Sequence, residues 1–191
     1  TQQIKDMEKK FRMEPPILYS FRRCPYAMRA RLAIHASEVE VQLREIVLRD
    51  KAPVFLESSP KGTVPIVVTE NNVVEESLDI MLWALSQEDP ERWLKMPDAG
   101  YDWISRNDGS FKAALDHTKY SDRFSNLDIN LERKKAANFL YDLNAQIADR
   151  PWMFGQNCSV ADMAILPFVR QFANIDIDWF GAQNWQNLHR W

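Results

Sequence analysis

Strand and helix patterns alternate along the first 85 residues of this chain, and strand patterns then disappear. Residues 17–21 form an apolar run typical of a buried strand, and residues 25–36 follow with a helical pattern. Residues 39–44 alternate apolar and polar side chains, as a strand does. A chain that alternates in this way is constrained to a small mixed sheet covered by helices.

The rest of the first half continues this alternation. Residues 53–58 fit a short helix, and residues 64–68 and 73–75 predict two strands joined by a hairpin turn. Residues 77–85 then follow a helical pattern, with Ser77 as the expected N-cap. The predicted order is therefore β-α-β-α-β-β-α.

The second half shows helical patterns alone. Residues 86–98 contain two prolines and four acidic residues, which is typical of a linker. Residues 159–162, Ser-Val-Ala-Asp, predict a capping box that starts a helix and serves folding. Helices are expected at 99–106, 108–120, 131–148, 159–172 and near the end. We therefore expect an α/β domain at residues 1–85, a linker at 86–98 and an all-helical domain at 99–191.

Composition excludes several classes of function. Of the 191 residues 46% are hydrophobic, enough for a core, and a net charge of −3 gives no basic footprint for nucleic acid. No apolar run reaches the roughly 18 residues that a membrane helix needs, and the charged residues 5–12 do not resemble a signal peptide. Cys24 and Cys158 suggest no disulfide framework, so we expect a cytoplasmic protein. The scattered histidines predict no metal site.

Cys24 stands where the first predicted strand gives way to the first predicted helix. Pro25 suits the first helical position, so the Cys24 sulfur lies at a helix N-terminus, where the dipole places partial positive charge. Arg22 and Arg23 add full positive charges nearby. Together these charges favour the thiolate, the nucleophilic form of cysteine. Cys24 is therefore the predicted nucleophile, with a buried structural cysteine as the alternative.

Four motifs occur in order along the chain: Cys-Pro-Tyr-Ala at residues 24–27, Ser-Pro-Lys-Gly-Thr-Val-Pro at 59–65, Glu-Ser at 76–77 and the capping box at 159. In this order and spacing the chain resembles the glutathione transferase family over nearly its whole length. Because it has a cysteine at the first strand–helix turn, the chain is similar to the omega-like and glutaredoxin-like members of the family, and among them to the bacterial kind. The resemblance implies a thioredoxin-like N-terminal domain followed by an all-α domain.

The resemblance also implies a glutathione site. In the family the proline matching Pro65 is cis, which would leave the Val64 backbone free to pair with an extended peptide. Ser77, at a helix N-terminus, would receive the γ-glutamyl carboxylate, and Glu76 would hold the γ-glutamyl ammonium. Lys51 matches the position that helps to hold the glycyl end. The alternatives are an ordinary helix cap, an edge-strand proline and a solvated lysine.

Three functions are open at this point. In the first, thiol transfer, Cys24 takes up a glutathionyl group that a second glutathione removes, and Ala27 in place of a resolving cysteine favours this route. In the second, glutathione is conjugated to an electrophile, with the hydroxyl of Tyr19 or Ser20 as the nearby activator. The third is a non-enzymatic binding module, since fold alone does not settle function.

The acceptor would be a small electrophile, a disulfide or a glutathionylated molecule. The helical half supplies its candidate contacts, which are Trp103, Phe111, His117, Tyr120 and Phe168. The resemblance leaves a homodimer open, and relatives usually continue a little beyond Trp191.

Overall fold

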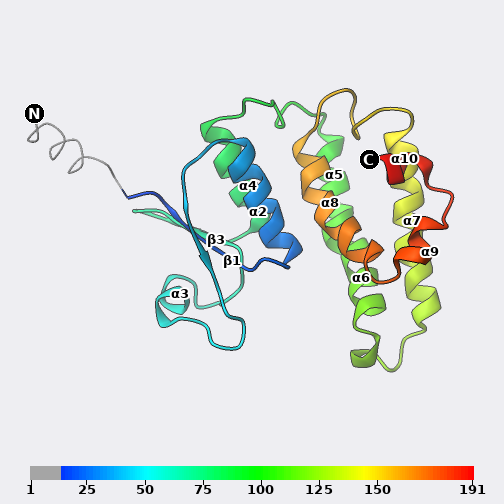
Figure 1. Ribbon diagram of the computed structural model, residues 1–191, viewed down its shortest axis with the longest axis horizontal. Coiled ribbons are helices and arrows are strands. Elements are labelled where there is room, and N and C mark those ends of the chain that lie inside the picture. The colour runs from blue at the N-terminus through cyan, green and yellow to red at the C-terminus, as the bar shows by residue number, and fades with distance from the viewer. Residues whose placement is uncertain (1–13) are drawn as a thin grey trace, which may run out of the picture.

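The computed structural model describes residues 14–191, so residues 5–12, which we compared with a signal peptide, lie outside the described residues. A sheet domain and a helical domain lie side by side, and the segment that follows α4 crosses from one to the other (Figure 1). This arrangement confirms the predicted thioredoxin-like domain followed by a helical domain. None of the described helices is long and apolar enough to cross a bilayer.

The described strands form one four-stranded mixed sheet in the order β2-β1-β3-β4. β1 runs parallel to β2 and antiparallel to β3, and β3 and β4 form the expected hairpin. Their bounds are β1 Ile17–Ser20, β2 Gln42–Glu45, β3 Ile66–Val68 and β4 Val73–Val74. The helices are α2 Pro25–Ala36, α3 Pro53–Ser58, α4 Ser77–Gln87, α5 Ala99–Arg106, α6 Lys112–Lys119, α7 Ile129–Ile147, α8 Val160–Ala173, α9 Ile177–Gly181 and α10 Gln186–Arg190.

Alternate residues of the inner strands face two different layers. Leu18 and Val67 belong to the main core with residues of α2 and α4, whereas Tyr19 and Ile66 pack with Phe55 of α3. Figure 1 shows α2 and α4 on the side of the sheet toward the helical domain and α3 away from it. Because side chains alternate along a strand, these inner strands bury apolar side chains on both faces.

The prediction for the second strand was wrong in its bounds. Strand pairing runs from Gln42 to Glu45 rather than from residue 39 to residue 44, and the Gln42 N–H donates to the Pro16 carbonyl at 2.8 Å. Residues 39–41 lie outside the strand and follow a turn in which Glu38 has a positive φ of 57°. All four side chains of β2 are exposed, so this strand forms an edge of the sheet.

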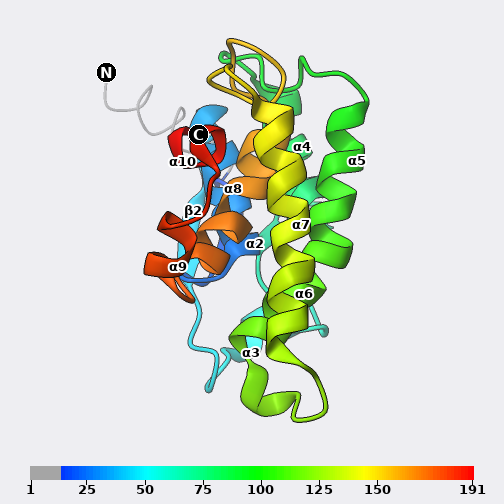
Figure 2. The same cartoon turned by 90° about the vertical axis from the view of Figure 1, so that its right-hand side faces the viewer.

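In the helical domain, α8 packs against both α2 and α5 and so joins the two domains. α5 and α6 continue into one another through a π-helix at Asn107–Phe111, so the two helices predicted there form one long rod (Figure 2). The capping box at α8 is confirmed: the Ser159 N–H donates to Asp162 at 2.9 Å, and Ser159 Oγ accepts from the Asp162 N–H.

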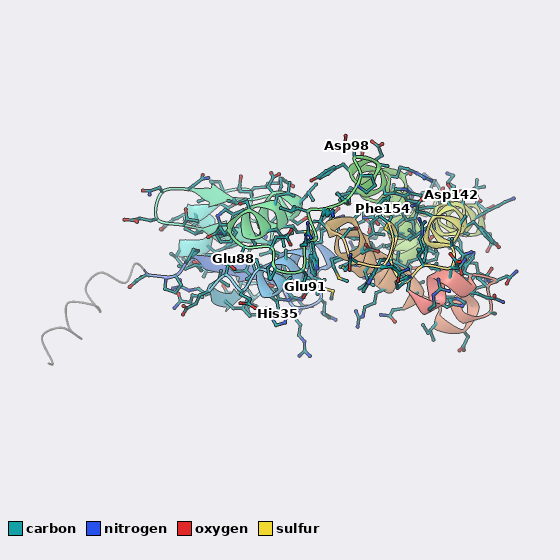
Figure 3. The ribbon with its side chains drawn as sticks, turned by 90° about the horizontal axis from the view of Figure 1, so that it is seen from above. His35, Glu88, Glu91, Asp98, Asp142 and Phe154 are labelled. Atoms are coloured by element: carbon teal, nitrogen blue, oxygen red, sulfur yellow. The ribbon has the colours of Figure 1, made fainter. Side chains whose placement is uncertain are left out.

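The segment between the domains is held against the helical domain. α4 ends at Gln87, two residues later than predicted, and the following chain carries Glu88, Glu91 and Asp98 across the top of the molecule (Figure 3). Trp93 of this segment is buried, and its carbonyl accepts from the Val160 N–H at 3.0 Å. The segment therefore has a fixed position beside the start of α8.

Candidate active site

A cleft of about 710 Å³ lies between the two domains, beside the start of α2. The sheet domain contributes Phe21, Arg23, Cys24, Pro25, Tyr26, Leu48 and Val64. The helical domain contributes the opposite wall, chiefly from α6 and the short turn at Ser121–Arg123, through Lys112, Asp116, Lys119, Tyr120, Arg123, Phe124 and Gln171.

Cys24 occupies the N-cap of α2, as the sequence predicts. Its backbone is extended, its N–H donates to the Phe21 carbonyl at 3.0 Å, and Pro25 is the first helical residue. The side chain is partly exposed in the cleft, with Sγ 3.9 Å from the Val64 carbonyl oxygen. Arg23 lines the same cleft, so the thiol combines a helix N-terminus, a nearby cation and access from solvent.

Cys158 has the opposite character. Burial raises the pKa of its thiol, and the nearby Asp162 carboxylate raises it further. Its Sγ lies 3.6 Å from the Ser159 carbonyl, next to the capping box. Cys158 therefore stays a protonated thiol near neutral pH and is not a competing nucleophile.

The Val64–Pro65 peptide bond is cis, as the family resemblance implies. Pro65 is buried and leads directly into β3, while Val64 lines the cleft. The structure therefore brings Val64 and Cys24 together.

The predicted carboxylate-binding residues lie at the start of α4, with one correction. Glu76, whose backbone is extended, is the N-cap, and Ser77 is the first helical residue. Ser77 is buried, and its Oγ accepts from Arg29 Nη1 at 3.3 Å. The Glu76 carboxylate is exposed and accepts from Lys61 Nζ at 2.6 Å. This bond joins the second and third motifs, and Ser59 Oγ also donates to the carboxylate of Glu75, the residue just before the third motif.

Arg29 is a residue that the sequence analysis missed. It is completely buried, and it donates from Nε to the Ala164 carbonyl of α8 at 2.6 Å and from Nη1 to Asp108 at 2.9 Å. Its guanidinium also lies 4.5 Å from the ring centroid of Phe168. Through Ser77 it connects the start of α4 to the helical domain. The sequence does carry a signal for this buried residue, because Arg29 is the one charged side chain among the small and apolar residues that α2 buries.

Tyr26 lines the cleft beside Cys24 and stays protonated at neutral pH. Burial raises the pKa of its phenol, and the Asp108 carboxylate raises it further. The neutral hydroxyl is therefore available as a hydrogen-bond donor in the cleft.

Several other candidates lie elsewhere. Of the five acceptor candidates, only Tyr120 lines the cleft. Phe111 and Phe168 are buried in the core. Trp103 packs edge-on against Phe139, and His117 bonds Glu132 at 2.8 Å.

The two hydroxyls proposed as activators are also outside the cleft. Tyr19 and Ser20 are buried, and their oxygens accept from Arg44 at 3.3 Å and from Arg31 at 2.5 Å. Lys51 does not line the cleft either. Its Nζ lies beside Gly62, 3.5 Å from the position that a Cβ on Gly62 would occupy.

Comparison with known proteins shows what this chain is similar to. Residues 18–93 match the family described as "Glutathione S-transferase, N-terminal domain". The chain is 26% identical over 164 residues to Glutathione S-transferase U22 of Arabidopsis thaliana, covering 82% of this chain and 73% of that protein. It is 33% identical over 86 residues to Glutathione S-transferase omega-1 of Rattus norvegicus, covering 44% and 35% of the two chains.

The fold agrees with solved structures of the same kind. A glutathione transferase family member from Pseudomonas fluorescens pf-5, solved with two glutathione bound, superposes with a TM-score of 0.79 at 14% identity, over 98% of this chain and 90% of that one. The sheet domain with its cis proline and the helical domain that follows it are consistent with the match to the glutathione S-transferase N-terminal domain. Residues 18–93 therefore match the N-terminal domain of the glutathione S-transferase family, and the chain as a whole has the glutathione transferase fold.

Proposed function

We propose that this protein is a glutathione-dependent thiol transferase in which Cys24 is the nucleophile. One observation carries the proposal: the Cys24 sulfur lies at the N-terminus of α2, partly exposed in the cleft and 3.9 Å from the Val64 carbonyl. The residue three positions later is the buried Ala27, where a dithiol enzyme has its second cysteine. A monothiol site of this kind needs glutathione itself to complete the cycle.

The cycle has two balanced exchanges. First, the Cys24 thiolate attacks the glutathionyl sulfur of a mixed disulfide, the old S–S bond breaks, and the acceptor leaves as a thiolate that takes a proton from water. Second, a glutathione thiolate attacks the glutathionylated Cys24, which forms glutathione disulfide and returns the Cys24 thiolate. The neutral Tyr26 phenol in the cleft can donate a hydrogen bond to a departing thiolate.

The same geometry supports a position for glutathione. Its cysteinyl unit would pair with the Val64 backbone, next to the cis Pro65, and bring its sulfur to Cys24. Its γ-glutamyl carboxylate would reach Ser77 at the start of α4, and its ammonium would replace Lys61 as the partner of Glu76. The glycyl carboxylate would extend toward Lys51, as the family resemblance implies.

Conjugation of glutathione to an electrophile is the second candidate. The observation in its favour is Tyr26, whose protonated hydroxyl lines the cleft and can hydrogen-bond a glutathione thiolate. Conjugation would need no covalent bond to Cys24.

Intact-mass measurement after incubation with oxidised glutathione distinguishes the two. Thiol transfer predicts one adduct of about 305 Da on the wild type and none on Cys24→Ser, which keeps the protonated Cys158 as an internal control. Cys24→Ser should still bind glutathione but transfer no thiol. Full thiol transfer by Cys24→Ser, or absence of the wild-type adduct, would overturn the proposal.

A further inference from the structure

Basic side chains greatly outnumber acidic ones around Cys24. A second cleft of about 540 Å³ adjoins the first and shares Arg23, Pro25, Lys119 and Gln171 with it. The charged residues that line the two clefts are six bases, Arg22, Arg23, Lys112, Lys119, Arg123 and Arg170, and a single described acid, Asp116. The whole chain has 24 basic and 27 acidic residues, so the excess of bases at the clefts is a local feature.

Among the described residues, carboxylates form an ion pair with only one of these six bases. Asp116 is paired with Lys112, one turn away on α6. Glu45 accepts from the backbone N–H of Arg22 at 2.6 Å and forms no ion pair with the Arg22 guanidinium. Asp122 is exposed and lines neither cleft. Within residues 14–191, no carboxylate oxygen lies within 4.0 Å of the side-chain nitrogens of Arg22, Arg23, Lys119, Arg123 and Arg170.

Tyr120 holds two of these cations at the wall opposite Cys24. Lys119 Nζ lies 5.0 Å from the centroid of the Tyr120 ring, and the Arg123 guanidinium carbon lies 4.6 Å from it. The ring attracts both cations but carries no net negative charge. Two like charges on one ring repel each other, and an anion between them removes that repulsion.

We propose that the acceptor bound opposite Cys24 is a small anion with a carboxylate or another oxyanion, recognised by Lys119 and Arg123 with Arg170 beside them. The inference rests on the proposed thiol transfer and names its substrate class. Basic side chains bind oxyanions through charge-assisted hydrogen bonds, and a cleft of one charge raises the local concentration of the opposite one. When Cys24 takes the glutathionyl group, the acceptor thiolate that leaves adds a further negative charge on the same side.

The test uses three mixed disulfides of glutathione that differ in the charge of the acceptor. The acceptor thiols are 3-mercaptopropionate, 2-mercaptoethanol and cysteamine, which are anionic, neutral and cationic. The double variant Lys119→Gln/Arg123→Gln is compared with Lys95→Gln/Lys134→Gln, which removes the same charge from exposed lysines outside both clefts. The measured quantity is kcat/KM for each disulfide, at low and at high salt.

We expect the ratio of kcat/KM for the anionic over the neutral disulfide to fall roughly tenfold in Lys119→Gln/Arg123→Gln and to stay unchanged in the control. High salt should lower the wild-type ratio because it screens exposed charges. An unchanged ratio in Lys119→Gln/Arg123→Gln would overturn the inference. So would an equal loss with all three disulfides, since the cations would then bind glutathione itself. Turnover of none of the three by the wild type would instead refute thiol transfer.

Discussion

The indole N–H of Trp191 donates to Asp162 at 2.8 Å, although the two residues are 29 positions apart. The same carboxylate accepts from the backbone N–H groups of Met153 and Ser159, each at 2.9 Å. Asp162 is completely buried. One carboxylate therefore joins the start of α8, the loop before it and the chain that follows α10.

Asp162→Ala should lower the free energy of unfolding by about 3 kcal/mol or more, because several donors lose their buried acceptor. Urea unfolding measures the loss. Asp142→Ala is the control, since it breaks only the exposed Asp142–Arg106 pair and should cost less than about 1 kcal/mol (Figure 3). The alkylation rate of Cys24 in the folded fraction should not change. A variant with normal stability but an unreactive Cys24 would contradict the structural role of Asp162.

The Arg29–Asp108 pair should show strong energetic coupling. Asp108→Asn leaves the buried guanidinium without a counter-charge, whereas Arg29→Met/Asp108→Asn removes both charges together. A double-mutant cycle of unfolding free energies should give a coupling of about 1–2 kcal/mol, a value that reflects the partial exposure of Asp108. Additive effects of the two substitutions would show that the contact between the domains has no net energetic value.

Ser77→Ala should weaken glutathione binding by about 1–2 kcal/mol, because a charge-assisted hydrogen bond to the γ-glutamyl carboxylate is lost. Titration calorimetry with glutathione measures this. Ser86→Ala, near the other end of the same helix, removes an exposed hydroxyl that bonds the Trp83 carbonyl and should leave the affinity unchanged. Equal affinity in the two variants would remove Ser77 from the site.

Glu38→Gly should raise the free energy of unfolding by up to about 1 kcal/mol. Glu38 has a φ of 57°, a conformation that costs an L side chain about 1–2 kcal/mol and costs glycine little. Thermal unfolding should show a higher midpoint. Glu40→Gly, also exposed but without a positive φ, should lower the midpoint because glycine adds freedom to the unfolded chain. A fall in both variants would contradict the turn geometry.

The sequence was most informative where local chemistry decides the outcome. Pro25 after Cys24 predicted the position of the thiol, and Ser159 with Asp162 predicted a helix start, because each depends on neighbours within one turn. Ser77 proved to be the first helical residue rather than the N-cap, and its bond to Arg29, 48 residues away, could not be predicted from neighbouring residues.

The residues of the cleft wall that the helical domain provides could not be predicted from sequence patterns for the same reason. Phe111 and Tyr120 lie on the same stretch of predicted helix, yet one is buried in the core and the other lines the cleft. Which of them faces the sheet domain depends on how α8 packs between the domains, and helical periodicity carries no information on that packing.

The two walls of the cleft have a consequence for how such a protein can change over evolutionary time. Cys24 and Val64 come from the sheet domain, whereas Lys119 and Arg123 come from the helical domain. Under the proposed function, mutations in the helical wall could alter which acceptor binds while Cys24 and the Val64 backbone stay intact. Drift, recombination or laboratory selection confined to that wall would diversify acceptors without rebuilding the chemistry.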